Sequence, residues 1–170
     1  MSSIEHKSEA PSQVRCKIIT VSDTRTIETD KSGALMRSLI EGSGHLIVEH
    51  MIVKDEEMHI REAVLQGCEQ KEIDVVLTNG GTGIAKRDVT IEAVGKIIEK
   101  EIPGFGELFR MLSYQYDIGS AALLSRAIAG VAGNTAIFAT PGSTGAVKLA
   151  MEKLILPELG HVVREVKKDL

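Results

Sequence analysis

Three glycines and a run of charged side chains lie together in LTNGGTGIAKRDVT, which spans residues 77–90. Glycine lets backbone N–H groups approach ligand oxygens, and a helix that begins after such a loop adds unpaired donors and a favourable dipole. The loop also carries Lys86, Arg87 and Asp88. Phosphate chemistry uses cations to offset phosphate charge and carboxylates to hold hydrated Mg²⁺. The segment therefore predicts a site for a phosphorylated ligand.

A second glycine-rich loop and a second acid belong to the same hypothesis. PGSTG, residues 141–145, also leads from an apolar run into a helical pattern, and Asp55 follows an apolar run in VKDEE. Four hydroxyls can add donors: Thr78, Thr82, Ser143 and Thr144. Taken alone, Asp88 is explained as an acid at a helix N-terminus and Asp55 as a solvated residue. Their pairing with the glycine loop favours a site where both acids and the two cations face one cleft.

Several familiar motifs are absent. The loop has neither the G-x-x-x-x-G-K-[ST] spacing of a P-loop nor G-x-G-x-x-G, since Lys86 stands three residues after Gly83. The chain also has no G-x-S-x-G elbow for a serine nucleophile. Transfer between two bound phosphates needs no protein nucleophile, because positioning and charge stabilisation suffice. On spacing alone, a tight turn that binds nothing remains an alternative.

Alternating strands and helices must position these loops. Continuous apolar runs predict buried parallel strands at 17–21, 45–53, 74–78 and 135–140. Helical spacing predicts helices around 35–40, 60–68, 91–98 with Thr90 as N-cap, 147–154, and one that Pro157 opens. Residues 101–127 read as irregular. The pattern predicts a three-layer α/β/α domain with a mostly parallel central sheet, whose ligands bind at the carboxyl ends of the strands.

Composition limits the remaining choices. The chain has 170 residues, which suits one domain at 15–170 after a disordered polar tail at 1–14. A net charge of −4 argues against a nucleic-acid partner. Cys16 and Cys68 form no CxxC and read as reduced thiols. Without a signal peptide pattern or a membrane span, we expect a cytoplasmic protein.

The loop resembles a family motif. It is similar to the T-x-GGTG-x-x-x-RD-x-T loop of molybdenum cofactor biosynthesis proteins of the MoaB/MogA type, also found as the G domain of gephyrin-like proteins. The match covers Thr78, Gly80, Gly81, Thr82, Gly83, Arg87, Asp88 and Thr90. Four other segments agree: ITVSDTR (19–25), VKDE (53–56), PGFGELFR (103–110) and ATPGSTGAV (139–147). Together these segments extend over most of the chain.

This resemblance implies a molybdopterin-binding fold, a trimer or hexamer, and adenylylation of the terminal phosphate of molybdopterin by Mg-ATP. The product would pass to the enzyme that inserts molybdate. The implied catalytic residues are Asp55 and Asp88, with Asp88 also at the metal. The implied ligand contacts are Ser22, Thr78, Gly80, Gly81, Thr82, Gly83, Glu107, Pro141, Gly142 and Ser143. For Glu107, an acid in the first turn of a helix is an equal alternative. A carrier that binds molybdopterin without turnover is the alternative function.

Aromatic and apolar residues gather in PGFGELFRMLSYQY, residues 103–116. If some of these side chains are exposed on one chain, they mark an interface between copies. Ordinary core packing is the alternative interpretation.

Overall fold

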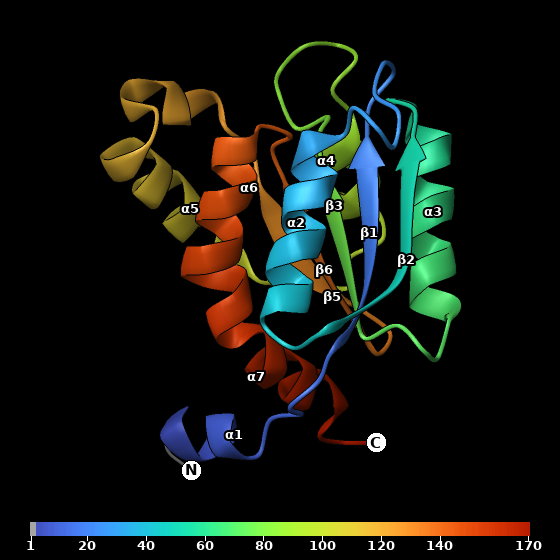
Figure 1. Ribbon diagram of the computed structural model, residues 1–170, viewed down its shortest axis with the longest axis vertical. Helices are drawn as coiled ribbons and strands as arrows, with labels where there is room; N and C mark the ends of the chain where they lie inside the picture. The colour runs from blue at the N-terminus through green and yellow to red at the C-terminus, as the bar shows by residue number, and fades with distance from the viewer. Residues whose placement is uncertain (1–2) are drawn as a thin grey trace.

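The computed structural model describes residues 3–170, without the side chains of Ser3 and His6, and forms three layers (Figure 1). The strands are β1 (Arg15–Val21), β2 (Leu46–Val53), β3 (Val75–Asn79), β4 (Lys100–Glu101), β5 (Ile128–Ala132) and β6 (Thr135–Thr140). The helices are α1 (Ser3–Ser8), α2 (Lys31–Gly42), α3 (Glu57–Glu69), α4 (Thr90–Gly95), α5 (Pro103–Tyr116), α6 (Thr144–Ala150) and α7 (Leu156–Lys167). A 3₁₀ segment, η1 (Gly119–Leu124), and a π-helical turn, η2 (Met151–Ile155), complete the elements.

The sheet has the order β2-β1-β3-β6-β5-β4. The first four strands are parallel, whereas β5 and β4 pair antiparallel at one edge. This architecture confirms the predicted α/β/α fold with a mostly parallel sheet. In the register, Thr20, Asn79 and Thr140 lie side by side at the ends of β1, β3 and β6. The loops that follow these strands therefore meet at one edge of the sheet.

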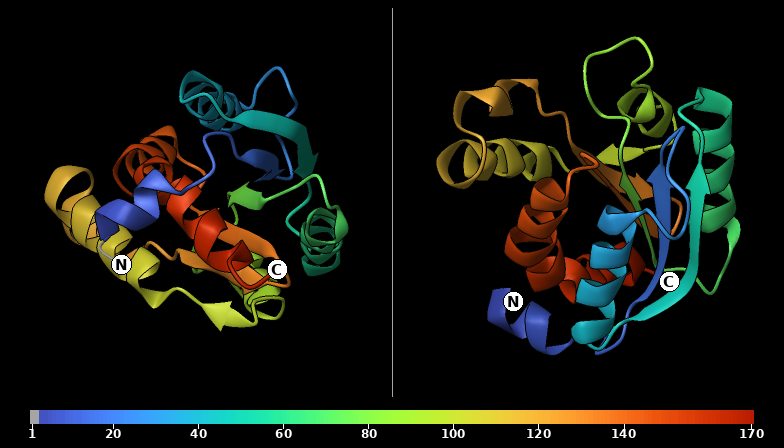
Figure 2. Two further views of the ribbon diagram at one scale, coloured as in Figure 1. Left: turned by 90° about the horizontal axis from the view of Figure 1, so that it is seen from below. Right: turned by 45° about the horizontal axis from the view of Figure 1, so that its top comes forward.

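Each face of the sheet has its own apolar core, because successive side chains of a strand point to opposite faces. Ile18 of β1 packs in the cluster beneath α2, α5, α6 and α7, and the neighbouring Ile19 packs beneath α3 and α4. Figure 2 shows these helices on the two sides of the sheet. On the α5 side, the ring of Phe105 meets Phe138 edge-to-face, with centroids 5.3 Å apart. Both cores hold the four parallel strands in register.

The region between α4 and β6 differs from the prediction. Residues 101–127 were expected to be irregular, but Pro103–Tyr116 is a helix that buries Phe105, Gly106, Phe109 and Ser113. The spacing of those residues is helical, yet glycine and polar positions interrupt its apolar pattern. β5 was not predicted either, since IAGVA is short and three of its five residues are alanine or glycine. Antiparallel pairing with β6 completes this strand through the two-residue turn Gly133-Asn134, with Gly133 at φ +57°. This Gly-Asn turn is the local signal that could have identified the hairpin.

The two helices predicted at the C-terminus form one continuous helical segment. Pro157 was expected to open a separate helix, because proline cannot donate the i→i−4 hydrogen bond. The π turn Met151–Ile155 precedes Pro157, and the N–H of Leu156 donates to the carbonyl of Met151 five residues back. This wider turn carries the chain into α7 without a break.

The N-terminal segment also differs from a disordered tail. Ser3–Ser8 form a short helix, and Lys7 pairs with Glu158 of α7 at 2.5 Å. Both side chains are about half exposed, so the pair adds little stability. Met1 and Ser2, which begin the predicted tail, lie outside the described residues. Within residues 3–170, every helix is too short or too polar to cross a lipid bilayer.

Candidate functional site

A cleft of about 480 Å³ lies at the carboxyl ends of the parallel strands. Its walls are the loops after β1, β2, β3 and β6, together with the end of η1, and the loop after β3 arches over the strand ends in Figure 1. The lining residues are Val21, Ser22, Thr24, Arg25, Asp55, Gly80, Gly81, Thr82, Gly83, Asp88, Leu124, Ser125, Pro141 and Gly142. The fold therefore places both glycine-rich loops and both predicted acids in one cleft.

The glycine loop takes a path that a side chain would block. Gly80 has φ +100°, and a Cβ there would lie 2.3 Å from the carbonyl oxygen of Val21. Gly81 has φ +67°, and its Cβ would lie 2.4 Å from Oγ1 of Thr90. Both torsions are in the region that glycine tolerates and other residues rarely adopt. The loop can therefore follow β1 closely only with glycine at these positions.

Carbonyl groups of the loop face away from unpaired amides. The hydroxyl of Thr90 donates to the carbonyl of Gly80 at 2.8 Å, and the N–H of Thr90 donates to that of Gly81 at 3.0 Å. Thr90 was predicted to cap α4, but Val89 occupies the cap position and makes no side-chain bond. Among the described residues, the N–H groups of Gly81, Thr82 and Gly83 find no acceptor. Such a row of unpaired amides is suited to phosphate oxygens.

Asp23 and Asp55 lie next to each other at the cleft, near enough to Asp88 for its charge to act on Asp55. Asp23 accepts two hydrogen bonds from Arg87, at 2.7 and 3.1 Å, and one from the N–H of Asp55 at 3.1 Å. The hydrogen bonds from Arg87 lower the pKa of Asp23. Asp55 has the opposite shift: burial, and then the charges of Asp23 and Asp88, raise its pKa. A cation held beside Asp55 would relieve that repulsion.

Asp88 is held at the other side of the glycine loop. Its Oδ2 accepts the N–H of Ala85 at 3.1 Å, and a Cβ on Gly83 would lie 2.6 Å from the same oxygen. Within the described chain, no group of three or more acidic, histidine or cysteine side chains is arranged to hold a metal alone. Mg²⁺ commonly binds one or two carboxylates and completes its shell with water and substrate phosphates. Asp55 and Asp88 together with a bound phosphate fit that requirement.

The predicted cations do not line the cleft. Arg87 is engaged by Asp23, and Lys86 is exposed on the outer part of the loop. Instead Arg25, which sequence reasoning missed, reaches the cleft from the loop after β1. It donates to the carbonyl of Gly142 through Nη1 and Nη2, both at 3.2 Å. The segment SDTR contains it, but no spacing rule separates this arginine from a surface one.

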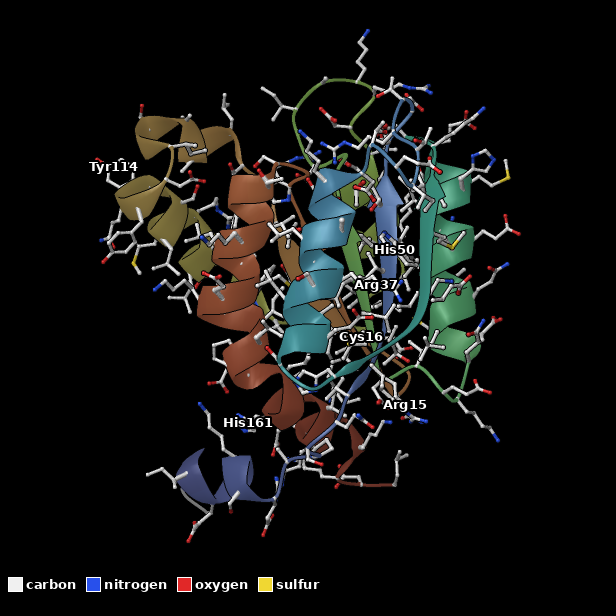
Figure 3. The ribbon with its side chains drawn as sticks, in the orientation of Figure 1. Arg15, Cys16, Arg37, His50, Tyr114 and His161 are labelled. Carbon is white, nitrogen blue, oxygen red and sulfur yellow. The ribbon has the colours of Figure 1, made fainter. Side chains whose placement is uncertain are left out.

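A buried polar layer supports the cleft from below. Asp30 caps α2 by accepting the N–H of Gly33 at 2.9 Å, and it accepts the hydroxyl of Thr20 at 2.6 Å. Asn79 donates to the same hydroxyl oxygen at 3.1 Å. His50, labelled in Figure 3, places Nε2 3.4 Å from Asp30. These contacts fix the ends of β1 and β3 immediately beneath the loops.

Three predicted contact residues lie outside the cleft lining. Thr78 is fully buried in β3. Ser143 caps α6, because its Oγ accepts the N–H of Ala146 at 3.1 Å. Glu107 is exposed on α5. The other predicted contacts, which are Ser22, Gly80, Gly81, Thr82, Gly83, Pro141 and Gly142, all line it.

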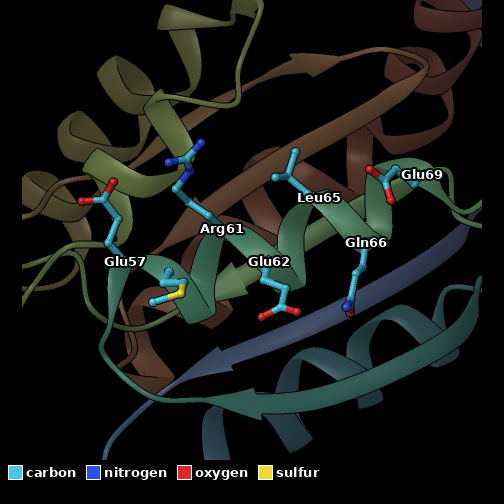
Figure 4. Close-up of a pocket in the computed structure, with 7 residues that line it drawn as sticks. Glu57, Arg61, Glu62, Leu65, Gln66 and Glu69 are labelled. Atoms are coloured by element: carbon cyan, nitrogen blue, oxygen red, sulfur yellow. The ribbon is translucent and has the colours of Figure 1, made fainter.

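A larger hollow, of about 770 Å³, lies on the outer face of α3 (Figure 4). Its lining comes from a single helix, with Glu57, Met58, Arg61, Glu62, Leu65, Gln66 and Glu69. It contains no glycine loop, and four of its seven lining side chains are glutamates or a glutamine turned outward (Figure 4). Charge and backbone geometry therefore favour the smaller cleft as the site for a phosphorylated ligand.

Comparison with known proteins identifies the family of the chain. The family described as "Probable molybdopterin binding domain" matches residues 17–161. Molybdenum cofactor biosynthesis protein B of Bacillus subtilis (strain 168) is 66% identical over 169 residues, which cover 99% of each chain. A crystal structure of a molybdenum cofactor biosynthesis protein B has 61% identity and a TM-score of 0.92, over 94% of this chain and 99% of that one.

A more distant structure has the same fold. The tungsten cofactor synthesizing protein MoaB from Pyrococcus furiosus has 35% identity and a TM-score of 0.83, over 93% of this chain and 99% of that one. The family match covers the glycine loop, both acids and the second loop. The chain belongs to the molybdopterin-binding family of molybdenum cofactor biosynthesis proteins.

Proposed function

We propose that this protein binds molybdopterin and transfers the adenylyl group of Mg-ATP to its terminal phosphate. The observation that carries the proposal is one cleft with unpaired loop amides on one wall and two carboxylates beside them. Membership of the family supports molybdopterin as the partner of this cleft. The amides suit a chain of phosphates, and the carboxylates suit the Mg²⁺ that accompanies ATP.

In the proposed reaction, an oxygen of the molybdopterin phosphate forms a bond to the α-phosphorus of ATP. The bond from that phosphorus to the β-phosphate bridging oxygen breaks, and pyrophosphate leaves with the electron pair. Gly81, Thr82 and Gly83 would donate N–H groups to the phosphates. Mg²⁺ would offset the charge of the triphosphate, held by Asp88 with support from Asp55. No protein nucleophile is required, since alignment and charge stabilisation supply the catalysis.

Asp88→Asn tests the assignment of the acids. We expect this variant to lose pyrophosphate release by at least about 100-fold, the range typical of losing one preorganised electrostatic group. Molybdopterin binding should persist, because the loop amides remain. Glu62→Gln, on the outer face of α3, is the matched control and should turn over like the unmodified protein. Normal turnover by Asp88→Asn would contradict the proposed role of this carboxylate.

A carrier that holds molybdopterin without turnover is the second candidate. It is favoured by the position of the two predicted cations outside the cleft lining, since Arg87 pairs with Asp23 and Lys86 is exposed. A phosphate clamp needs the amides and not the carboxylates. The carrier therefore predicts that Asp55→Asn and Asp88→Asn bind molybdopterin at least as tightly as the unmodified protein does, with no ATP-dependent product from any of them.

We also propose that the protein forms a homo-oligomer, a trimer or a hexamer. Apolar side chains lie exposed on α5 and η1, including Met111, Tyr114 and Leu123, the last of which is 86% exposed. Figure 3 shows Tyr114 at the outer end of α5, away from the sheet. A monomer mass measured by light scattering at micromolar concentration would contradict this proposal.

We further propose that the protein is cytoplasmic, where ATP is available, and that its product passes to the enzyme that inserts molybdate.

A further inference from the structure

Arg126 lies behind the glycine loop, between η1 and β5, and all its nitrogens are directed at that loop or at α4. Its Nε–H donates to the carbonyls of Thr82 and Gly83, at 3.0 and 3.1 Å. Its Nη2 donates to Gly83 at 2.7 Å and to the carbonyl of Asp88 at 3.4 Å. Nη1 pairs with Glu92 at 2.5 Å. One guanidinium thus joins both ends of the glycine loop to the first turn of α4.

These contacts determine where the loop amides point. In a planar trans peptide, the N–H of one residue points opposite to the carbonyl of the residue before it. Because the carbonyls of Thr82 and Gly83 are directed at Arg126, the N–H groups of Gly83 and Ile84 point away from it. Gly83 lines the cleft, as do Leu124 and Ser125, but Arg126 does not. The guanidinium and the ligand therefore occupy opposite sides of the loop.

A simple surface ion pair does not account for this arrangement. Glu92 is 47% exposed, and a pair of that kind contributes little. Four of the contacts of Arg126 instead go to main-chain carbonyls, which accept no other hydrogen bond within residues 3–170. Only a planar fork of five donors can serve the carbonyls and a carboxylate together, which a lysine cannot do.

We propose that Arg126 is a positioning residue, which holds the loop from Thr82 to Asp88 so that its amides are preorganised for phosphate without touching the ligand. This inference rests on the proposed function for the identity of the ligand as a phosphate compound. The orientation of the loop by Arg126 stands independently of that identity.

The test compares Arg126→Gln with Arg37→Gln, a control on α2 whose arginine pairs with Glu41 on the surface. Hydrogen exchange is measured in the ligand-free protein at Ala85, Asp88 and Thr90, whose amides are bonded within the loop. Affinity for Mg-ATP is measured by calorimetry. For Arg126→Gln we expect exchange at these amides to rise about tenfold or more and affinity to fall about 10- to 100-fold. Arg37→Gln should change neither.

Chemical rescue separates positioning from a general loss of stability. Methylguanidinium should restore part of the Mg-ATP affinity of Arg126→Ala, because the missing group alone re-forms the contacts. Unchanged exchange in Arg126→Gln would overturn the proposal. If affinity for Mg-ATP were lost while exchange stayed unchanged, Arg126 would instead contact the ligand directly. If the unmodified protein binds no Mg-ATP, the proposed function fails while the exchange data still decide the role of Arg126.

Discussion

Replacing Gly80 with alanine tests the backbone path that creates the site. Two separate costs follow from the structure. The first is the torsion, since φ +100° disfavours any residue with a Cβ by about 1–2 kcal/mol. The second is contact, because the new Cβ would lie 2.3 Å from the carbonyl oxygen of Val21, and overpacking costs about 1–3 kcal/mol. Together they predict a loss of about 2–5 kcal/mol in the free energy of unfolding.

Gly44 provides a matched control for the torsion alone. It has φ +85°, and a Cβ there would meet nothing within 4 Å. Gly44→Ala should therefore cost only about 1–2 kcal/mol. Urea unfolding of both variants gives the difference, and a loss of about 3 kcal/mol in Gly80→Ala would lower the Tm by roughly 6–12 °C for a domain of this size. If Gly80→Ala lost no more than Gly44→Ala, the close approach of the loop to β1 would be refuted.

Two further predictions concern pH. Burial and neighbouring carboxylates raise the pKa of Asp55 above 3.8, so the ionised carboxylate destabilises the folded protein. Asp55→Asn should therefore have a higher free energy of unfolding near neutral pH. Urea unfolding should show this gain vanish as the pH falls below about 4. Burial opposes ionisation of Asp74, but hydrogen bonds from Arg15 and Lys167 outweigh it and lower its pKa from 3.8 to about 2. Asp74→Asn should therefore cost about 2 kcal/mol at pH 7, a difference that closes between about pH 4 and pH 2. A constant difference across that range would contradict the role of the Asp74 pairs.

The parallel half of the fold was predictable because its signals are local. KIITV and DVVLT are buried on both faces, so their apolar runs are continuous, and each is followed by a loop with glycine or acids. Asp55 and Asp88 could be joined in one cleft because parallel strands bring their carboxyl ends to one edge. The glycine loop was recognisable because its torsions exclude most other residues at Gly80 and Gly81.

The remaining features depend on contacts distant in sequence. Arg126 is 43 residues from Gly83 in the sequence. It lies behind the loop because β5, which follows it, pairs antiparallel with β6. Ser143 and Thr78 look like ligand donors in the sequence, but one caps a helix and the other is enclosed in the sheet. Arg87 looks like a phosphate ligand until the loop after β1 places Asp23 against it. Charge pairing of this kind cannot be deduced from spacing along one segment.

Incubation with molybdopterin and Mg-ATP tests the central claim most directly. The products are separated by chromatography, with parallel samples that lack Mg²⁺ or contain Asp88→Asn. Transfer of the adenylyl group predicts adenylylated molybdopterin and an equal amount of pyrophosphate, both absent from the two parallel samples. Molybdopterin that stays bound and unmodified in the complete mixture would contradict the enzyme and leave the cleft as a phosphate clamp.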